Sequence, residues 1–173
     1  QGQRDYTVKT VITTNAAKIS AKYKKLLKKL DGVQARATDM LADEAIVLYQ
    51  KTTRTWRHKP VFKKRKTARG VQIVTSDEVY KFVDLGTRPH IIRAKNAPFL
   101  VFAGPYKAAT KPRVIGSTNA TVGNNWSRKL MVHHPGNKPR HFTDEITKRI
   151  NKRAGVVVKR EINKVINSEG FGL

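Results

Sequence analysis

The five histidines are the side chains of this sequence best suited to acid–base chemistry or to metal binding. No two of them have the i, i+4 spacing with which a helix places two imidazoles on one metal ion. Residues 85–143 contain no Asp or Glu, so most of the histidines lack a nearby carboxylate that would orient the imidazole. We therefore interpret them as structural residues and predict neither a metal site nor a cofactor. They are His58, His90, His133, His134 and His141.

Adjacent carboxylates are the other residues that could support catalysis, because metal-dependent phosphodiester cleavage needs clustered acids to hold divalent ions. Three adjacent pairs occur, at 43–44, 77–78 and 144–145. The last pair is typical of the first turn of a helix, and the middle pair of a hairpin turn. No phosphate-binding loop, dinucleotide fingerprint or nucleophile elbow is present. The sequence therefore predicts no catalytic residue and no enzyme; the nuclease alternative would use Asp43, Glu44, Asp77 or Glu78.

Positive charge dominates the composition, with 36 Lys and Arg against 12 Asp and Glu and a formal net charge of +24. Residues 85–143 carry ten of these bases, and residues 51–69 carry nine, without any acid in either segment. Such a surface attracts a polyanion or an acidic protein face. We predict that two basic segments are exposed and contact DNA or a protein partner. They comprise Lys63, Lys64, Arg65 and Lys66 in one segment, and Lys107, Lys111 and Arg113 in the other.

Length and composition limit the architecture that the elements can form. The 173 residues, 39% of them hydrophobic, are enough for one compact domain with polar excursions. The absence of cysteine excludes disulfides and thiolate metal sites. No apolar run approaches the ~20 residues that a membrane span needs, and we expect no membrane partner.

Helical periodicity is strong at both ends of the chain. We expect an extended N-terminal arm over 1–14, a basic amphipathic helix over 16–30, a break at Asp31–Gly32 and a second helix from Val33. The apolar stripe of the first helix is expected to pack into the core or against a neighbouring subunit, in preference to a membrane surface. A long helix begins near Phe142 and is weakened at Gly155, where a kink or break is expected. A flexible tail follows over 169–173.

The middle of the chain has the alternation of strands. We expect a hairpin of 71–74 and 79–83 around a turn at 75–78, a buried strand over 99–103, and a last strand over 130–133. Residues 104–125 form a long loop or extended hairpin. The fold class is therefore α+β: a small antiparallel β-sheet packed by two N-terminal helices and a long C-terminal helix, in one domain over 15–168.

Two motifs stand out in the chain: residues 80–95 read YKFVDLGTRPHIIRAK, and residues 134–142 read HPGNKPRHF. These motifs resemble the tail-component family of lambda-like siphophages, whose members include neck, head–tail connector and tail-completion proteins. The resemblance extends over roughly residues 50–150 and includes WRHKPVF at 56–62. The signature positions are Gly86, Thr87, His90, His134, Pro135, Gly136, Arg140 and Phe142.

These signatures make physical sense as parts of a scaffold. Gly86 permits a bend after a regular element, and Pro135–Gly136 is a turn dipeptide that can aim the following helix. Arg140 and Phe142 are expected to anchor that helix, one through a polar contact and the other in the core.

The resemblance implies a structural protein of a tailed-phage virion, assembled in the host cytoplasm and placed at the head–tail junction. It implies a homo-oligomeric ring, a hexamer with a dodecamer as the alternative. The ring would contact a connector or stopper ring and tail-tube or terminator proteins, and genome DNA would pass through its lumen. Neck and tail-end positions both stay open, and we expect the N-terminal arm and first helix to contact adjacent subunits. The alternative from charge alone is a non-specific basic DNA-binding protein.

Overall fold

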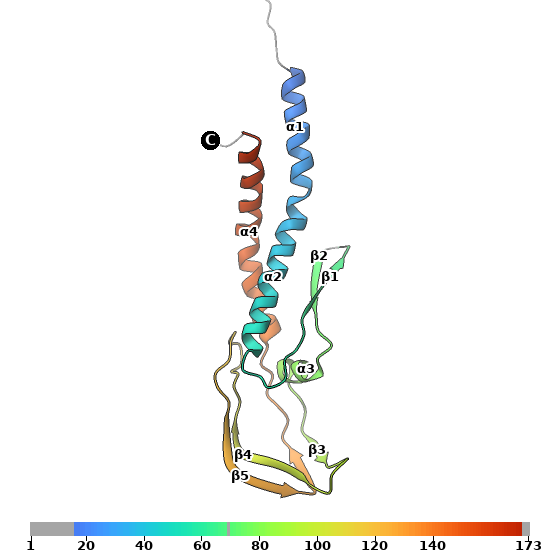
Figure 1. The fold of residues 1–173 in the computed structure, drawn as a ribbon, viewed down its shortest axis with the longest axis vertical. Helices are drawn as coiled ribbons and strands as arrows, with labels where there is room; N and C mark the ends of the chain where they lie inside the picture. The colour runs from blue at the N-terminus through green and yellow to red at the C-terminus, as the bar shows by residue number, and fades with distance from the viewer. Residues whose placement is uncertain (1–15, 69, 171–173) are drawn as a thin grey trace, which may run out of the picture.

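The computed structural model describes residues 16–68 and 70–170 and has the predicted α+β fold class (Figure 1). Within this part of the chain the strands form three antiparallel two-stranded sheets rather than one sheet. The expected N-terminal arm and the last three residues of the expected tail lie outside the described residues. The elements are α1 (Ala16–Asp31), α2 (Val33–Thr53), β1 (Lys63–Thr67), β2 (Gly70–Val74), α3 (Glu78–Leu85), β3 (His90–Arg93), β4 (Leu100–Lys107), β5 (Thr121–Lys129), β6 (Met131–His134) and α4 (Phe142–Ser168).

Helices α1 and α2 run on as one rod, so the expected break at Asp31–Gly32 is not a change of direction (Figure 1). The physical reason is that Gly32 has right-handed helical dihedrals, φ −82° and ψ −8°. Its carbonyl also accepts a hydrogen bond from the Arg36 backbone N–H at 3.1 Å, which continues the helical ladder. Three residues of the apolar stripe of α1 do not enter the core of this chain, because they are half exposed or more: Ile19 (53%), Tyr23 (52%) and Leu27 (62%).

Helix α4 lies antiparallel to α2 and is continuous through Gly155, where a kink or break was expected (Figure 1). The buried positions start at Phe142 and Ile146 and move to Val157, Glu161 and Val165 further along. A strict four-residue repeat advances 400° per step and drifts away from one face of a 3.6-residue helix. The 11 residues from Ile146 to Val157 correspond to two steps of four and one step of three, and the shorter step returns the buried positions to one face of α4.

The hairpin expected over 71–83 is wrong, because residues 79–83 belong to helix α3. Asp77 precedes this helix, and its carboxylate accepts a hydrogen bond from the Tyr80 backbone N–H at 2.7 Å. This N-cap satisfies an otherwise unpaired donor, and it starts a helix where the alternation of apolar residues had suggested a strand. Strand β2 pairs instead with β1, in the register Lys63 with Val74 and Thr67 with Gly70.

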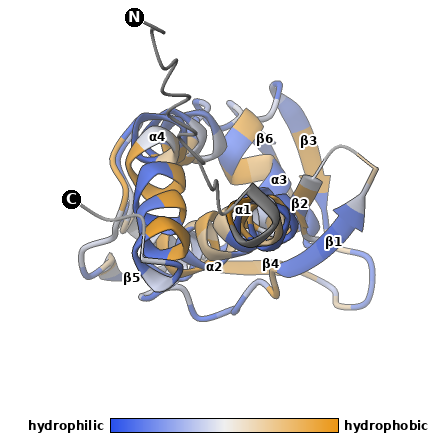
Figure 2. Cartoon of the chain, turned by 90° about the horizontal axis from the view of Figure 1, so that it is seen from above, coloured by the Kyte–Doolittle hydropathy of each residue, from blue (hydrophilic) through white to orange (hydrophobic). Residues whose placement is uncertain are grey.

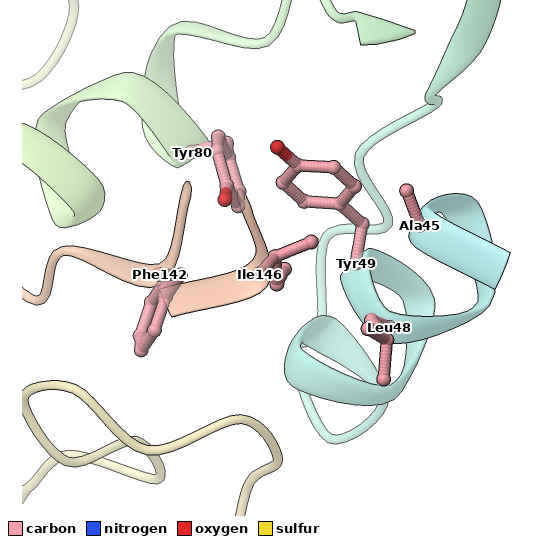
Figure 3. Close-up of a cluster of buried hydrophobic side chains, with 6 residues drawn as sticks. All are labelled: Ala45, Leu48, Tyr49, Tyr80, Phe142 and Ile146. Atoms are coloured by element: carbon pink, nitrogen blue, oxygen red, sulfur yellow. The ribbon is translucent and has the colours of Figure 1, made fainter. Parts of the chain in front are cut away.

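The hydrophobic core lies where α2, α3 and the first turn of α4 meet (Figure 3). Phe142 is fully buried, which confirms its expected place in the core. The Tyr49 ring stacks on Phe62 at 4.7 Å between centroids, and Tyr80 meets Phe62 edge-on at 5.1 Å. Burial raises the pKa of the Tyr80 hydroxyl above its ordinary value. The fully buried part of the cluster consists of Ala45, Leu48, Tyr49, Tyr80, Phe142 and Ile146.

Candidate interaction surface

Residues 87–137 form one long antiparallel structure, which we call the ribbon. A bridge between Thr87 and Asn137 closes its base, β3 then pairs with β6, and β4 pairs with β5. Six residues, 94–99, lie opposite the single Leu130 between the two paired segments. Such an unequal insertion bends a two-stranded structure, and Figure 1 shows β4 and β5 turning away from the direction of β3 at the end of the molecule opposite α1.

The tip of the ribbon returns to the helical body. The Thr55 hydroxyl donates a hydrogen bond to the Thr118 carbonyl at 3.1 Å, and the Arg113 N–H donates to the Arg140 carbonyl at 2.7 Å. Ile115 packs against the core cluster. The segment predicted as a long loop or extended hairpin is thus a hairpin, attached to the body at its base and at its tip, with β4 and β5 spanning the distance between the two attachments.

The two motifs at 80–95 and 134–142 meet at the base of the ribbon. Gly86 and Gly136 have positive φ angles of 77° and 84°, which side chains with a Cβ rarely adopt. A Cβ on Gly86 would lie 2.6 Å from the Asn137 carbonyl oxygen, and one on Gly136 would lie 2.2 Å from the Thr87 carbonyl oxygen. The Thr87 N–H donates to the Asn137 carbonyl at 3.0 Å, and the Asn137 N–H donates to the Thr87 hydroxyl at 2.9 Å. Two motifs about fifty residues apart therefore form one interlocked joint that needs both glycines.

The histidines of the two signatures face each other next to this joint. His90 and His134 are paired across β3 and β6, with ring centroids 5.0 Å apart. The Gly136 N–H donates to Nδ1 of His134 at 3.0 Å, while Nδ1 of His90 lies 2.8 Å from the Arg88 carbonyl oxygen. His134 therefore accepts at Nδ1 and His90 donates from Nδ1. Both imidazoles fix backbone groups of the joint, as expected for structural histidines.

A carboxylate from α3 caps the start of α4. Asp84 is 5% exposed, and its Oδ1 accepts hydrogen bonds from the backbone N–H groups of Phe142 at 2.5 Å and Thr143 at 3.2 Å. The N-cap position of α4 is His141, which has left-handed dihedrals and makes no side-chain capping bond. The first turn of a helix has free N–H groups that favour a negative charge. Asp84 supplies this charge from 58 residues earlier in the chain.

The remaining expected anchor is Arg140, which holds the joint through its backbone. Its N–H donates to the Asp84 carbonyl at 3.0 Å. Its side chain lines a cavity of about 510 Å³ between α3, the ribbon and the segment after α2. Trp56 and Val83 contribute apolar walls there, and Arg57 and Lys138 add further positive charge.

Most acids of the described residues are engaged by bases within the helical body and are not available to a cofactor. Lys64 contacts Asp39 at 2.7 Å and Asp43 at 2.9 Å, and these hydrogen bonds raise the pKa of Lys64. A hydrogen bond from Lys29, with help from Lys25, lowers the pKa of Glu169, which is thus held rather than lying in a flexible tail. The other bridges join Arg36, Arg160 and Lys164 to Glu161, Arg153 to Glu44, and Arg113 and Lys148 to Glu145.

Two histidines have carboxylate partners that the sequence did not reveal. His58 pairs with the Asp77 carboxylate at the start of α3, and Nδ1 of His141 lies 3.3 Å from Asp144. Burial alone would raise the pKa of Asp77, but hydrogen bonds from the Tyr80 N–H and from His58 lower it below its ordinary value. In the described part of the chain no three His, Asp or Glu side chains gather closely enough to hold a metal ion. Within the same residues no helix is long and apolar enough to cross a bilayer.

The two basic segments predicted as contact elements lie on different sides of the molecule (Figures 1 and 2). Lys63–Lys66 form β1, whose side chains are exposed, but Lys64 is held by α2. Lys107 and Lys111 are exposed at the end of β4 and in the ribbon tip. Arg113 has a positive φ of 58° and lies 3.6 Å from Glu145. The structure therefore does not join these residues into one patch.

The ribbon carries charge that nothing else in the described residues neutralises. Of the ten bases between Leu85 and Thr143, only Arg113 has an ion pair within the described part of the chain. The others keep their charge at the surface: Arg88, Arg93, Lys95, Lys107, Lys111, Arg128, Lys129, Lys138 and Arg140.

Large apolar side chains accompany these charges. The expectation of a buried strand over 99–103 is wrong, because Phe99 is 47% and Val101 is 58% exposed. Within the described residues no helix covers β4 and β5, so large apolar side chains of both strands stay exposed. Figure 2 shows the apolar stretches in β3, β4 and β6. Exposed apolar side chains in this number mark an interaction site. They lie on both faces of the ribbon, because successive residues of a strand point to opposite faces, and they are Ile91, Ile92, Phe99, Val101, Phe102, Val122, Trp126, Leu130 and Met131.

Trp126 is the most important residue that sequence reasoning missed. At 72% exposure it is a large aromatic side chain in open solvent on β5. Its neighbours on the same face follow from the register, because directly opposed residues of an antiparallel pair share a face. Val101 opposes Arg128 and Ala103 opposes Trp126. We call these four residues the Trp126 face. The i, i+2 spacing of Trp126 and Arg128 around Ser127 could have indicated a shared strand face.

Comparison with protein-family models, curated proteins and solved structures finds no match to this chain. The resemblance to the siphophage tail-component family therefore rests on the sequence motifs alone.

Proposed function

We propose that this chain is a structural subunit of the head–tail junction of a tailed phage, where copies of it form a ring around the DNA channel. The observation that carries the proposal is the ribbon. A two-stranded structure without a covering layer is marginally stable in water, and this one exposes Val101, Trp126 and Leu130 at 58%, 72% and 70%. Burial against another chain removes both costs, and a subunit of a permanent assembly meets this condition.

The chemistry of the described residues supports an assembly role over catalysis. Three of the four carboxylates that a nuclease would use have structural partners: Asp43 holds Lys64, Glu44 holds Arg153, and Asp77 caps α3. The signature residues form the joint of the ribbon and the cap of α4. They fix where the ribbon points, which is what an assembly surface requires.

Gene deletion and composition analysis test the proposal together. Phage lacking the chain should produce filled heads and separate tails, and mass spectrometry of wild-type particles should detect the chain in a fixed, small copy number per virion. Normal particle yield after deletion, together with absence of the chain from purified virions, would refute it.

Non-specific DNA binding is the second candidate, and it is favoured by the seven bases of the ribbon that have no ion pair within the described residues. Phosphate contacts release counterions, so the affinity for duplex DNA would fall steeply as salt rises. The exposed apolar residues argue against DNA as the main partner, since phosphates make no use of Val101 or Leu130. Tight, salt-sensitive duplex binding by a dispersed monomer, combined with absence from virions, would establish this candidate instead.

A further inference from the structure

The ribbon presents a defined mixture of anchor and charge on one face. Trp126, which is 72% exposed, stands on β5 with Arg128 two residues along. Val101, which is 58% exposed, lies on β4 directly across from Arg128 and therefore diagonally from Trp126. Tryptophan and arginine are the residues most often found at the energetic centre of protein interfaces. Nothing within the described residues covers them, and no acid of the ribbon is available to neutralise Arg128.

We propose that the Trp126 face binds an acidic protein surface with an apolar centre, carried by a different protein of the particle. This inference rests on the proposed function and adds the chemistry of the partner. An apolar pocket on the partner would receive Trp126 and Val101, and carboxylates at the rim of that pocket would pair with Arg128. Such a partner would bury the exposed apolar side chains of the face and neutralise its positive charge.

A second copy of this chain is a poor occupant of this face. The chain carries a formal charge of +24, and the acids of its helical body already pair with its own bases, as Asp39, Glu44 and Glu161 do. Docking one copy onto the ribbon of another would bring surfaces of the same sign together, which opposes association. DNA would neutralise the charge but would leave Val101 without a partner.

Photo-crosslinking inside the particle tests this assignment. Benzoylphenylalanine at position 126 would be incorporated in the phage, purified virions would be irradiated, and the attached peptide would be identified by mass spectrometry. We expect the crosslink to reach another virion protein, in a segment where acids outnumber bases and flank apolar residues. The same probe at Lys159, an exposed base on α4 far from the ribbon, should not reach that segment.

Several outcomes would overturn the inference, and they separate it from the proposed function. A crosslink to a second copy, to DNA, to a basic segment or to nothing would reject the acidic partner while the chain stays a virion protein. Absence of the chain from virions would reject both proposals.

Once the crosslinked segment has been identified, it can be made as a peptide, and substitutions in this chain then give an independent measure of the affinity. Trp126→Ala should weaken its binding about thirtyfold or more, as expected of an interface anchor. Arg128→Glu should weaken binding of the acidic peptide, because the new carboxylate repels the carboxylates of the peptide. Added salt should then lower the affinity of this variant less than it lowers that of the wild type. Both side chains are solvent-exposed, so thermal unfolding of the variants should match the wild type. Equal affinities of wild type and Trp126→Ala would refute the anchor.

Discussion

Removing the carboxylate of Asp84 should destabilise the whole fold, although Asp84 is far in sequence from the helix that it caps. Asp84→Ala leaves the buried Phe142 N–H without an acceptor, which costs about 1–3 kcal/mol. Loss of the negative charge at the start of α4 adds about 1 kcal/mol. We therefore expect the free energy of unfolding to fall by roughly 2–4 kcal/mol. Asp84→Asn keeps one acceptor oxygen and should lose about 1 kcal/mol.

Thermal and urea unfolding measure this effect directly. For a chain of this size, 1 kcal/mol corresponds to about 2–4 °C in Tm, so Asp84→Ala should lower Tm by roughly 4–16 °C. The matched control is Asp144→Ala in the first turn of the same helix. The Asp144 side chain is 64% exposed, and its removal should cost about 0.5 kcal/mol. A loss for Asp84→Ala no larger than that of the control would refute the capping role.

Three further predictions follow from the joint, from α4 and from the ribbon. Gly86→Ala should prevent stable folding, because the new Cβ would lie 2.6 Å from the Asn137 carbonyl oxygen. Gly155→Ala, at an open position in a helix, should instead raise the free energy of unfolding by about 0.5–1 kcal/mol. Urea titration measures both variants, and equal effects of the two substitutions would contradict the joint. Because the pKa of Glu169 is lowered in the folded state, its contribution to stability is complete above its ordinary value of 4.5 and is lost as pH falls through the lowered value. Glu169→Gln should therefore flatten the acid limb of a Tm-against-pH curve, and an unchanged limb would exclude the contact with Lys29. Trp126→Ala should leave Tm unchanged within about 1 °C yet abolish assembly of infectious particles, as plaque counts would show; a large fall in Tm would mean that the side chain packs within the chain.

The helices were the most predictable part of the molecule. The helices expected from Val33 and from Phe142 are present, and Phe142 is buried as expected; Ala45 and Leu48 in α2 and Ile146 in α4 are buried beside it. Short segments were less predictable. The alternation of 79–83 suggested a strand, but one side chain, Asp77, caps this segment as a helix. A local hydrogen bond thus outweighed a pattern of hydrophobic residues.

The motifs located the joint, whereas the interaction surface required the structure. Gly86 and Gly136 were recognisable as backbone positions with special geometry, but their mutual contact depends on tertiary pairing. The continuous apolar run at 99–103 indicated a buried strand. That prediction was wrong because an apolar run in the sequence does not show whether any other part of the same chain covers the strand. The cap by Asp84 on α4 has no local signal at all.

The measurement that tests the central claim most directly is electron microscopy of purified virions of the source phage, with the chain located by fitted density. The account predicts several copies at one level of the head–tail junction, arranged as a ring, with the Trp126 face of each ribbon buried against a different protein. Absence of the chain from mature particles, or a ring in which these ribbons point into solvent, would contradict it.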